Sequence, residues 1–106
     1  MTDRKKEAQK NFAQYLQDGL IKKEKNETAK AMYIKNAGMS LSLAEECMNS
    51  SLNPYIWVVV ISYYSMFYIA NAVLLELGYK TGDKIVHKVT NDALIVLVMD
   101  KIKKGY

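Results

Sequence analysis

The sequence predicts an all-α protein, an antiparallel bundle of about four helices with one central, nearly uncharged helix. Half of its 106 residues are hydrophobic, and it contains one Pro and five Gly, a composition typical of a globular chain with few loops. No charged residue occurs from Asn53 to Leu75, and the flanking segments carry apolar residues at helical spacing. A chain of this length has room for one core, so we expect a single domain over residues 1–106.

The segments before the uncharged stretch predict two amphipathic helices. The first covers about Asp3–Lys25, with a weak point at Gly19, and Asn26–Thr28 is a plausible break because Asn and Thr are good N-caps. The second covers about Glu27–Asn49. Its apolar stripe follows the i, i+3, i+4, i+7 spacing of a helix face and consists of Ile34, Ala37, Gly38, Leu41, Ala44 and Met48.

The uncharged stretch predicts the third helix. Asn53 can cap it, and Pro54 suits the first helical position, where its missing N–H is not needed. The β-branched run Ile56–Ile61 alone would suit a strand. However, the apolar segment continues to Leu77 before a natural helix stop at Gly78, so its length favours a helix.

The C-terminal segment predicts a short loop and a fourth helix. The loop is Tyr79–Asp83, and the helix runs from about Asp83 to Lys103, with lysines at the negative end of its dipole. The residues expected to face inward are Val86, Val89, Ala93, Val96 and Leu97.

The uncharged stretch is also long enough to cross a membrane. Against this, Tyr63 and Tyr64 would lie in the middle of the bilayer, whereas spanning helices keep tyrosines at the interfaces. We therefore expect no membrane span, and a helix that lies at the centre of a bundle or in a dimer interface. The N-terminal residues lack the apolar core of a signal peptide, which predicts a cytoplasmic protein.

Few residues could carry chemistry. The single cysteine, Cys47, excludes an intramolecular disulfide and a paired-cysteine metal site, and no phosphate-binding or metal motif is present, so no cofactor or metal is expected. His87 is the only histidine, and Lys80 and Lys84 lie near it. A histidine among lysines suits a general base or a phosphate contact, and a partly exposed histidine on a solvated helix face is the simpler interpretation.

Polar groups on the uncharged helix form the second candidate set. Tyr63 and Tyr64 carry hydroxyls that need partners if they are buried. A buried Asn71 is costly unless its amide is satisfied, so it would either fix helix register or contribute to a polar cleft. For the hydroxyls, bonds to carbonyls one turn back are the alternative to a ligand-binding role.

The segment from Ser62 to Gly78, with its Tyr63–Tyr64 pair, resembles the central-helix motif of the HEPN superfamily (higher eukaryote and prokaryote nucleotide-binding domains). In that family a loop and a histidine-bearing helix follow, which places His87 at the family's histidine. The resemblance covers roughly residues 28–106. It implies a helical bundle that usually dimerises, and the family's final helix is missing or cut short after Tyr106, as in a fragment or a chain that needs a partner to cover its core.

The resemblance also implies what the chain could do, although some relatives have no settled activity. Many relatives are RNases of toxin–antitoxin or other defence systems, and others act beside a nucleotidyltransferase partner. The RNase branch uses an arginine four to six residues before the histidine. Here the only arginine is Arg4, far from His87 in the sequence, and Lys80, with six residues between, lacks the planar fork that clamps a phosphate.

Three functional hypotheses follow. The first is a dimeric, non-catalytic HEPN-like module that binds a nucleotide, RNA or a partner protein. The second is an RNase toxin in which Lys80 clamps the phosphate and His87 is the general base. The third is a structural dimer or adaptor with Trp57 in its interface. The formal charge of +4 is compatible with all three.

Overall fold

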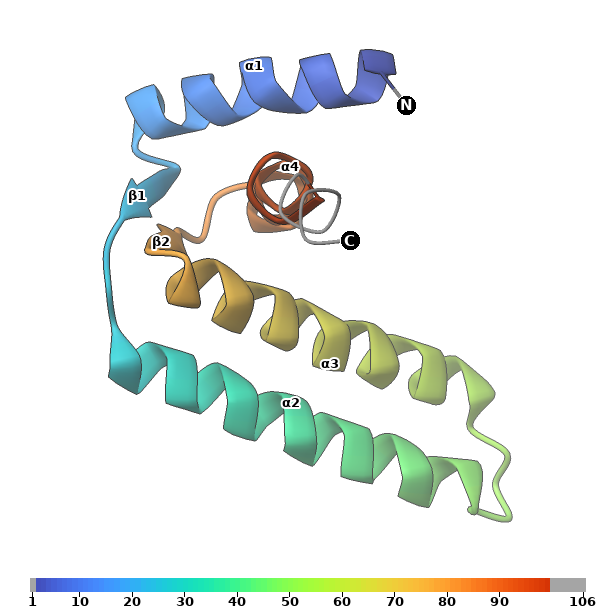
Figure 1. Ribbon diagram of the computed structural model, residues 1–106. Helices are drawn as coiled ribbons and strands as arrows, with labels where there is room; N and C mark the ends of the chain where they lie inside the picture. Colours follow the sequence, from blue (N-terminus) through green and yellow to red (C-terminus); the bar gives the residue numbers. More distant parts are fainter. Residues whose placement is uncertain (1, 100–106) are drawn as a thin grey trace. The chain divides into compact units, whose positions relative to one another are not determined.

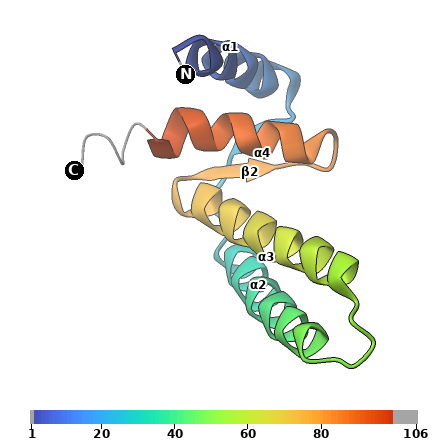
Figure 2. The same ribbon diagram turned by 90° about the vertical axis from the view of Figure 1, so that its right-hand side faces the viewer.

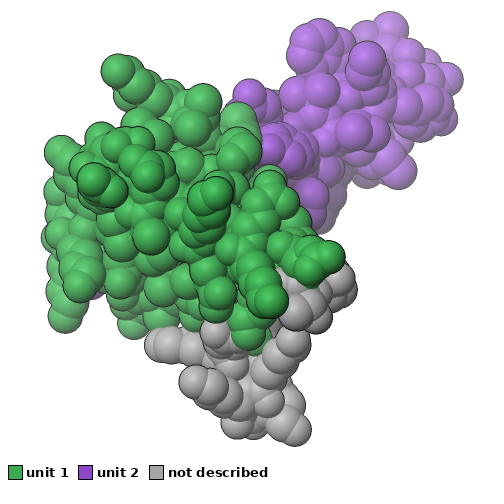
Figure 3. Space-filling model, turned by 90° about the horizontal axis from the view of Figure 1, so that it is seen from above, with its two compact units in different colours: residues 1–26, 74–106 green, residues 27–73 purple. Residues whose placement is uncertain are grey.

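The computed structural model describes residues 2–99 and confirms the all-α class (Figure 1). The elements in chain order are α1 (Thr2–Asp18), β1 (Ile21–Lys23), α2 (Glu27–Met48), α3 (Tyr55–Glu76), β2 (Tyr79–Thr81), α4 (Val86–Leu94) and the π-helical turn η1 (Ile95–Met99). Contacts group the chain into two compact units, shown in different colours in Figure 3. Unit 1 comprises residues 1–26 and 74–106, and unit 2 comprises residues 27–73.

The first helix is shorter than predicted, because it ends at Gly19 and a strand follows. Gly19 has φ 73°, a left-handed conformation that favours glycine and ends helices. The chain then forms β1, which pairs antiparallel with β2 in the register Ile21 opposite Thr81. The predictions of helix through Lys25 and of a loop over Tyr79–Asp83 are therefore wrong. A three-residue strand carries too little periodicity to be recognised, and its partner lies far along the sequence.

Unit 1 has a closed apolar core. Figure 2 shows α4 between α1 and β2. The buried residues of this core are Phe12, Tyr15, Ile21, Leu74, Val89 and Ala93. The ring of Phe12 meets Tyr79 of β2 edge to face, with centroids 5.5 Å apart, a favourable aromatic geometry.

The predicted limits of α3 hold to within two residues, with a different cap. The carbonyl of Pro54 accepts from the N–H groups of Trp57 and Val58, each at 3.1 Å, so Pro54 is the cap residue. Asn53 instead adopts φ 52°, and its side-chain oxygen accepts from the hydroxyl of Tyr55 at 3.3 Å. At the other end Gly78 has φ 91°, which confirms the predicted glycine stop.

The fourth helix begins three residues later than predicted. Ile85, immediately before it, has φ 43°, a conformation that β-branched residues rarely adopt. Val89 and Ala93 are fully buried, as predicted, and Val96 and Leu97 pack against the same core. The α-helix changes to a π-helical turn after Leu94, and the predicted end at Lys103 lies outside the described residues.

Unit 2 is a hairpin of two antiparallel helices, α2 and residues 55–73 of α3. The hydroxyl of Ser65 donates to the carbonyl of Ala37 at 2.9 Å, and the rings of Tyr33 and Tyr68 lie 6.1 Å apart. Small residues on α2 allow this close approach, and Ala37 and Ala44 are its buried residues. The larger members of the predicted apolar stripe stay half or more exposed, because the stripe is wider than the face that α3 covers. They are Ile34, Leu41 and Met48.

Candidate functional site

The residues predicted to form a site fall into different units. Lys80, Lys84 and His87 belong to unit 1. Tyr63, Tyr64 and Asn71 belong to unit 2. Each group is therefore described within its own unit.

In unit 1, Lys80 lies in the middle of β2, directly opposite Lys22 of β1. Directly opposite residues of an antiparallel pair project from the same face, so this small ribbon presents two like charges side by side. Lys84 is exposed in the turn that follows, and His87 lies half-buried in the first turn of α4. Like charges at adjacent positions repel unless an anion neutralises them. The two strands β1 and β2, called here the basic ribbon, are therefore a candidate contact for a phosphate.

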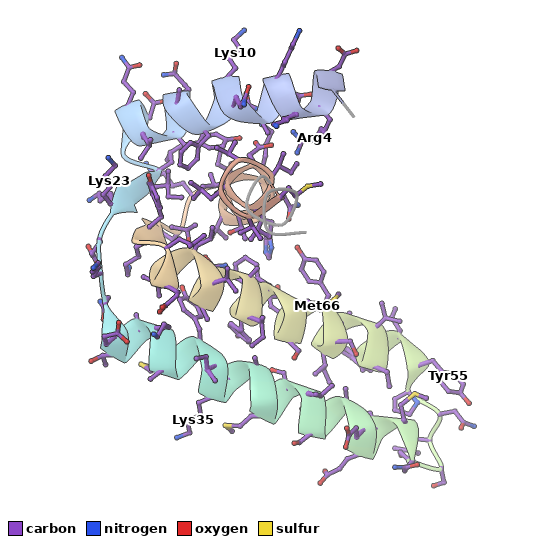
Figure 4. The ribbon with its side chains drawn as sticks, in the orientation of Figure 1. Arg4, Lys10, Lys23, Lys35, Tyr55 and Met66 are labelled. Atoms are coloured by element: carbon purple, nitrogen blue, oxygen red, sulfur yellow. The ribbon has the colours of Figure 1, made fainter. Side chains whose placement is uncertain are left out.

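Arg4 is engaged with a buried carboxylate of α4. Asp92 is fully buried, and its Oδ1 lies 2.7 Å from Nη2 of Arg4. Its Oδ2 accepts from the hydroxyl of Tyr15 at 2.6 Å and from the amide of Asn11 at 3.3 Å. Nζ of Lys88 lies 3.7 Å from the same Oδ2. Figure 4 shows Arg4 pointing from α1 toward α4, whereas Lys10 points away.

The charges of this Asp92 cluster (Arg4, Asn11, Tyr15, Lys88 and Asp92) support one another. Burial raises the pKa of Asp92, but the hydrogen bonds from Tyr15, Arg4 and Asn11 outweigh it, so the pKa lies below its ordinary value of 3.8. Burial and the bond to Asp92 raise the pKa of Tyr15, which Lys88 partly opposes. The carboxylate is thus ionised at neutral pH and ties α1 to α4.

The guanidinium of Arg4 therefore makes a structural contact with Asp92, and the position of Asp92 relative to His87 on α4 decides whether that contact lies beside the histidine. Asp92 follows His87 by five positions, which places the two side chains about 140° apart around an α-helix. No sequence motif marks this cluster, although one signal was present: Asp92 falls between Val89 and Ala93 on the predicted apolar face of its helix. A lone carboxylate at such a position needs a partner.

In unit 2 the contacts of Asn71, Tyr63 and Tyr64 described below are with residues of the same helix. Asn71 is 2% exposed, and its side-chain amide donates to the carbonyl of Phe67, one turn back, at 3.1 Å. Tyr63 and Tyr64 are 43% and 41% exposed, so the burial that would oblige their hydroxyls to find protein partners does not occur in the single chain. Their rings meet edge to face at 5.7 Å.

The most unusual feature of unit 2 is its exposed apolar surface. Among the described residues eighteen large hydrophobic side chains are exposed, and all but Ile85 belong to unit 2. Helix α3 is long and apolar enough to cross a membrane by length and composition, yet only 22% of its most apolar window is buried. Within the single chain, one partner helix covers only one face of α3, so most of its apolar surface is exposed. A dimer interface, the other location expected for this helix, stays a prediction. Surfaces of this kind mark interaction sites.

The two helices of the hairpin differ on their outer sides. Figure 4 shows Lys35 of α2 and Met66 of α3 on opposite sides of the hairpin. The outer side of α2 carries polar residues such as Ser42 and Glu46 among its apolar ones. Residues 55–73 of α3 carry no charge at all. The hairpin thus has one side on which charged and polar residues interrupt the exposed apolar ones, and one side without any charge.

The described residues contain no group of His, Cys, Asp or Glu that could hold a metal ion. Cys47 is half-buried in a groove at the end of the hairpin beside Leu43 and Trp57. The chain matches no protein-family model, no curated protein and no solved structure. Functional assignment therefore depends on the residues and their geometry.

Proposed function

We propose that the chain is a non-catalytic, HEPN-like helical module that acts by binding a protein partner through the apolar surface of its hairpin. The observation that supports this most is the segregation of exposed hydrophobic side chains, seventeen of the eighteen described, into unit 2. Covering a fully exposed aliphatic or aromatic side chain is worth about 1.5–3 kcal/mol. Even partial coverage of this surface would therefore provide enough driving force for association.

The contact of Arg4 with Asp92 supports the proposal that the chain does not cleave RNA, because it occupies the arginine that such chemistry would need. The chain has one arginine, and its guanidinium is held by Asp92. Lys80 sits opposite another lysine in the ribbon, where it can attract an anion but cannot clamp one with a planar fork. The alternative, an RNase toxin that uses His87 and Lys80, lacks the arginine that such chemistry employs in the resembled family.

Two measurements test the proposal. Purified chain in detergent-free buffer is expected to associate, as seen by light scattering after size exclusion. It is also expected to degrade RNA no faster than the His87→Ala variant. RNA cleavage that disappears in His87→Ala would contradict the non-catalytic role, and a soluble chain that never associates would contradict the interaction role.

The basic ribbon supports a second candidate function, binding of a phosphate backbone. Unit 1 carries thirteen Lys and Arg against eight Asp and Glu, whereas unit 2 carries two against three, so the basic excess belongs to unit 1. The pairing of Lys22 with Lys80 concentrates part of that excess on one face. Cationic patches of this kind bind nucleic acid through its phosphates.

The test is RNA affinity at several salt concentrations, by fluorescence anisotropy with a single-stranded oligonucleotide. The double variant Lys22→Gln/Lys80→Gln is expected to weaken binding and to reduce the slope of log K against log salt by about 1.4. Lys30→Gln/Lys35→Gln removes the same charge from unit 2 and serves as the control. Equal affinities of the two double variants would rule out the ribbon as the site.

A further inference from the structure

Helix α3 presents two rows of side chains on opposite sides. The first row faces α2 and contains Ser65, which bonds to Ala37, and Tyr68, which contacts Tyr33. The second row follows the alternating three- and four-residue spacing of a coiled-coil seam on the opposite side of the helix. It consists of Ile56, Val59, Tyr63, Met66, Ala70 and Val73, and is called here the outer seam.

The outer seam is uncovered in the single chain. Its large members are 38–72% exposed, and Ala70 is half-buried. A seam of this spacing positions side chains to insert between those of a second helix. Because nearly every residue of α3 is apolar, exposure and spacing together define this row, and a straight row along about five turns of a helix fits a second helix as its occupant.

We propose that the occupant is the outer seam of a second copy of this chain, running antiparallel, so that two hairpins associate through their α3 helices. This inference rests on the proposed interaction function and names the partner of the same surface. The two-fold axis would pass between Tyr64 and Ser65. Ile56 would then face Val73 of the second copy, Val59 would face Ala70, and Tyr63 would face Met66.

The pairing is self-complementary in size. The ends of the seam match a larger residue with a smaller one, since Ile56 meets valine and Val59 meets alanine. The small Ala70 allows close approach of the two helices, as small residues do at other helix contacts. At the centre, each Met66 sulfur meets the ring of Tyr63, a favourable sulfur–aromatic contact that occurs twice by symmetry. An isologous interface requires this kind of self-matching surface.

The surface area that the two copies would bury is also adequate for a stable interface. Covering the outer seam and its flanking residues Tyr55 and Ile69, which are 61% and 46% exposed, would remove on the order of 600–800 Å² per copy, close to one side of a standard protein interface. No charge opposes the association, because residues 53–75 contain none. A charged partner surface would lose its hydration against such a seam without gaining an ion pair.

A lipid bilayer fits the same helix less well. A spanning α3 would place Tyr63, Tyr64 and Asn71 within the hydrocarbon region, and tyrosines prefer the interfaces. The helix packed against it, α2, carries Lys35 on its outer side, where lipid would surround it. A second hairpin covers only the α3 side and leaves α2 in water.

The first test compares two matched variants by analytical ultracentrifugation in detergent-free buffer. Met66→Glu places a charge on the outer seam, and Met39→Glu places the same charge on α2. The two methionines are 65% and 62% exposed, so neither change disturbs the packing of the single chain. We expect wild type and Met39→Glu to sediment as dimers and Met66→Glu to sediment as a monomer, with a dissociation constant raised at least about 100-fold.

The second test determines the register by disulfide cross-linking in a Cys47→Ser background. Chains with Val59→Cys are mixed with chains with Ala70→Cys under mild oxidation. The antiparallel pairing predicts cross-linked heterodimers, whereas a parallel pairing would link Val59→Cys chains to each other. Predominant Val59→Cys homodimers would overturn the proposed arrangement.

The outcomes separate this inference from the function on which it rests. If wild type associates and Met39→Glu, rather than Met66→Glu, dissociates it, the outer seam is not the interface but the hairpin remains an interaction surface. If wild type is a soluble monomer at all concentrations, both proposals fail. If it remains in solution only with detergent and floats with phosphatidylcholine vesicles, α3 is a membrane segment and both proposals fail.

Discussion

Asp92 is a fully buried carboxylate on α4, and three side chains of α1 hold it. Replacing it with asparagine keeps the size but removes the charge that Arg4 and Tyr15 face. We expect Asp92→Asn to lower the free energy of unfolding by about 2–4 kcal/mol at neutral pH. Urea unfolding monitored by circular dichroism measures this. Asp83→Asn, at an exposed turn position, is the control and should stay within about 0.5 kcal/mol.

The contribution of Asp92 also depends on pH. Its folded-state pKa lies below the ordinary value of 3.8, so the folded state binds the proton less readily than the unfolded state. The stabilisation is therefore fully present above about pH 4 and is lost as the pH falls through the folded-state pKa. The difference in unfolding free energy between wild type and Asp92→Asn should shrink below pH 4. A difference that stays constant into strong acid would contradict the assignment.

Ile85 holds a strained backbone conformation at the start of α4. Its φ of 43° is costly for a β-branched residue and easy for asparagine, which is also a favoured N-cap. Ile85→Asn is expected to stabilise the protein by about 1 kcal/mol, measured as a higher urea midpoint. Ile85→Val retains the branched side chain and should give no such gain.

At the scale of elements, α3 has a buried end and an exposed body. Leu74 is fully buried in the core of unit 1, whereas Leu41 of α2 is 53% exposed. Leu74→Ala should lower the free energy of unfolding by about 2–5 kcal/mol, the usual cost of a cavity. Leu41→Ala makes the same chemical change and should cost much less. Similar losses at both positions would show that unit 2 is more closely packed than the structure indicates.

The long helices were predictable because their signals are local. The start of α2 at Glu27, the length of α3 and its stop at Gly78 follow from capping residues and apolar runs. The strands were not predictable, since Ile21–Lys23 gains its conformation from pairing with a segment more than fifty residues away. Gly19, noted only as a weak point, in fact ends α1.

The candidate site was harder to predict for the same reason. The choice of His87, Lys80 and Lys84 as site residues stays a prediction, and the lysine of β1 that lies opposite Lys80 could not be found from sequence spacing. The engagement of Arg4 with Asp92 joins residues 88 positions apart. The exposure of Tyr63 and Tyr64 could not be predicted, because an apolar helix does not reveal which of its faces α2 covers.

At the scale of the whole molecule, the two units divide the properties of the chain. Unit 1 contains the closed core, the Asp92 cluster and the basic excess. Unit 2 contains five charged residues, with two Lys against three Glu, and nearly all of the exposed large hydrophobic side chains. This division is the basis for assigning association to the hairpin and phosphate contact to the ribbon.

The central claim is that the apolar hairpin associates with a second copy of the chain. Sedimentation equilibrium of the unmodified protein in detergent-free buffer, over a series of concentrations, tests it most directly. The account predicts an average mass that approaches twice that of the chain as the concentration rises. A mass that stays at that of one chain throughout the series would contradict it.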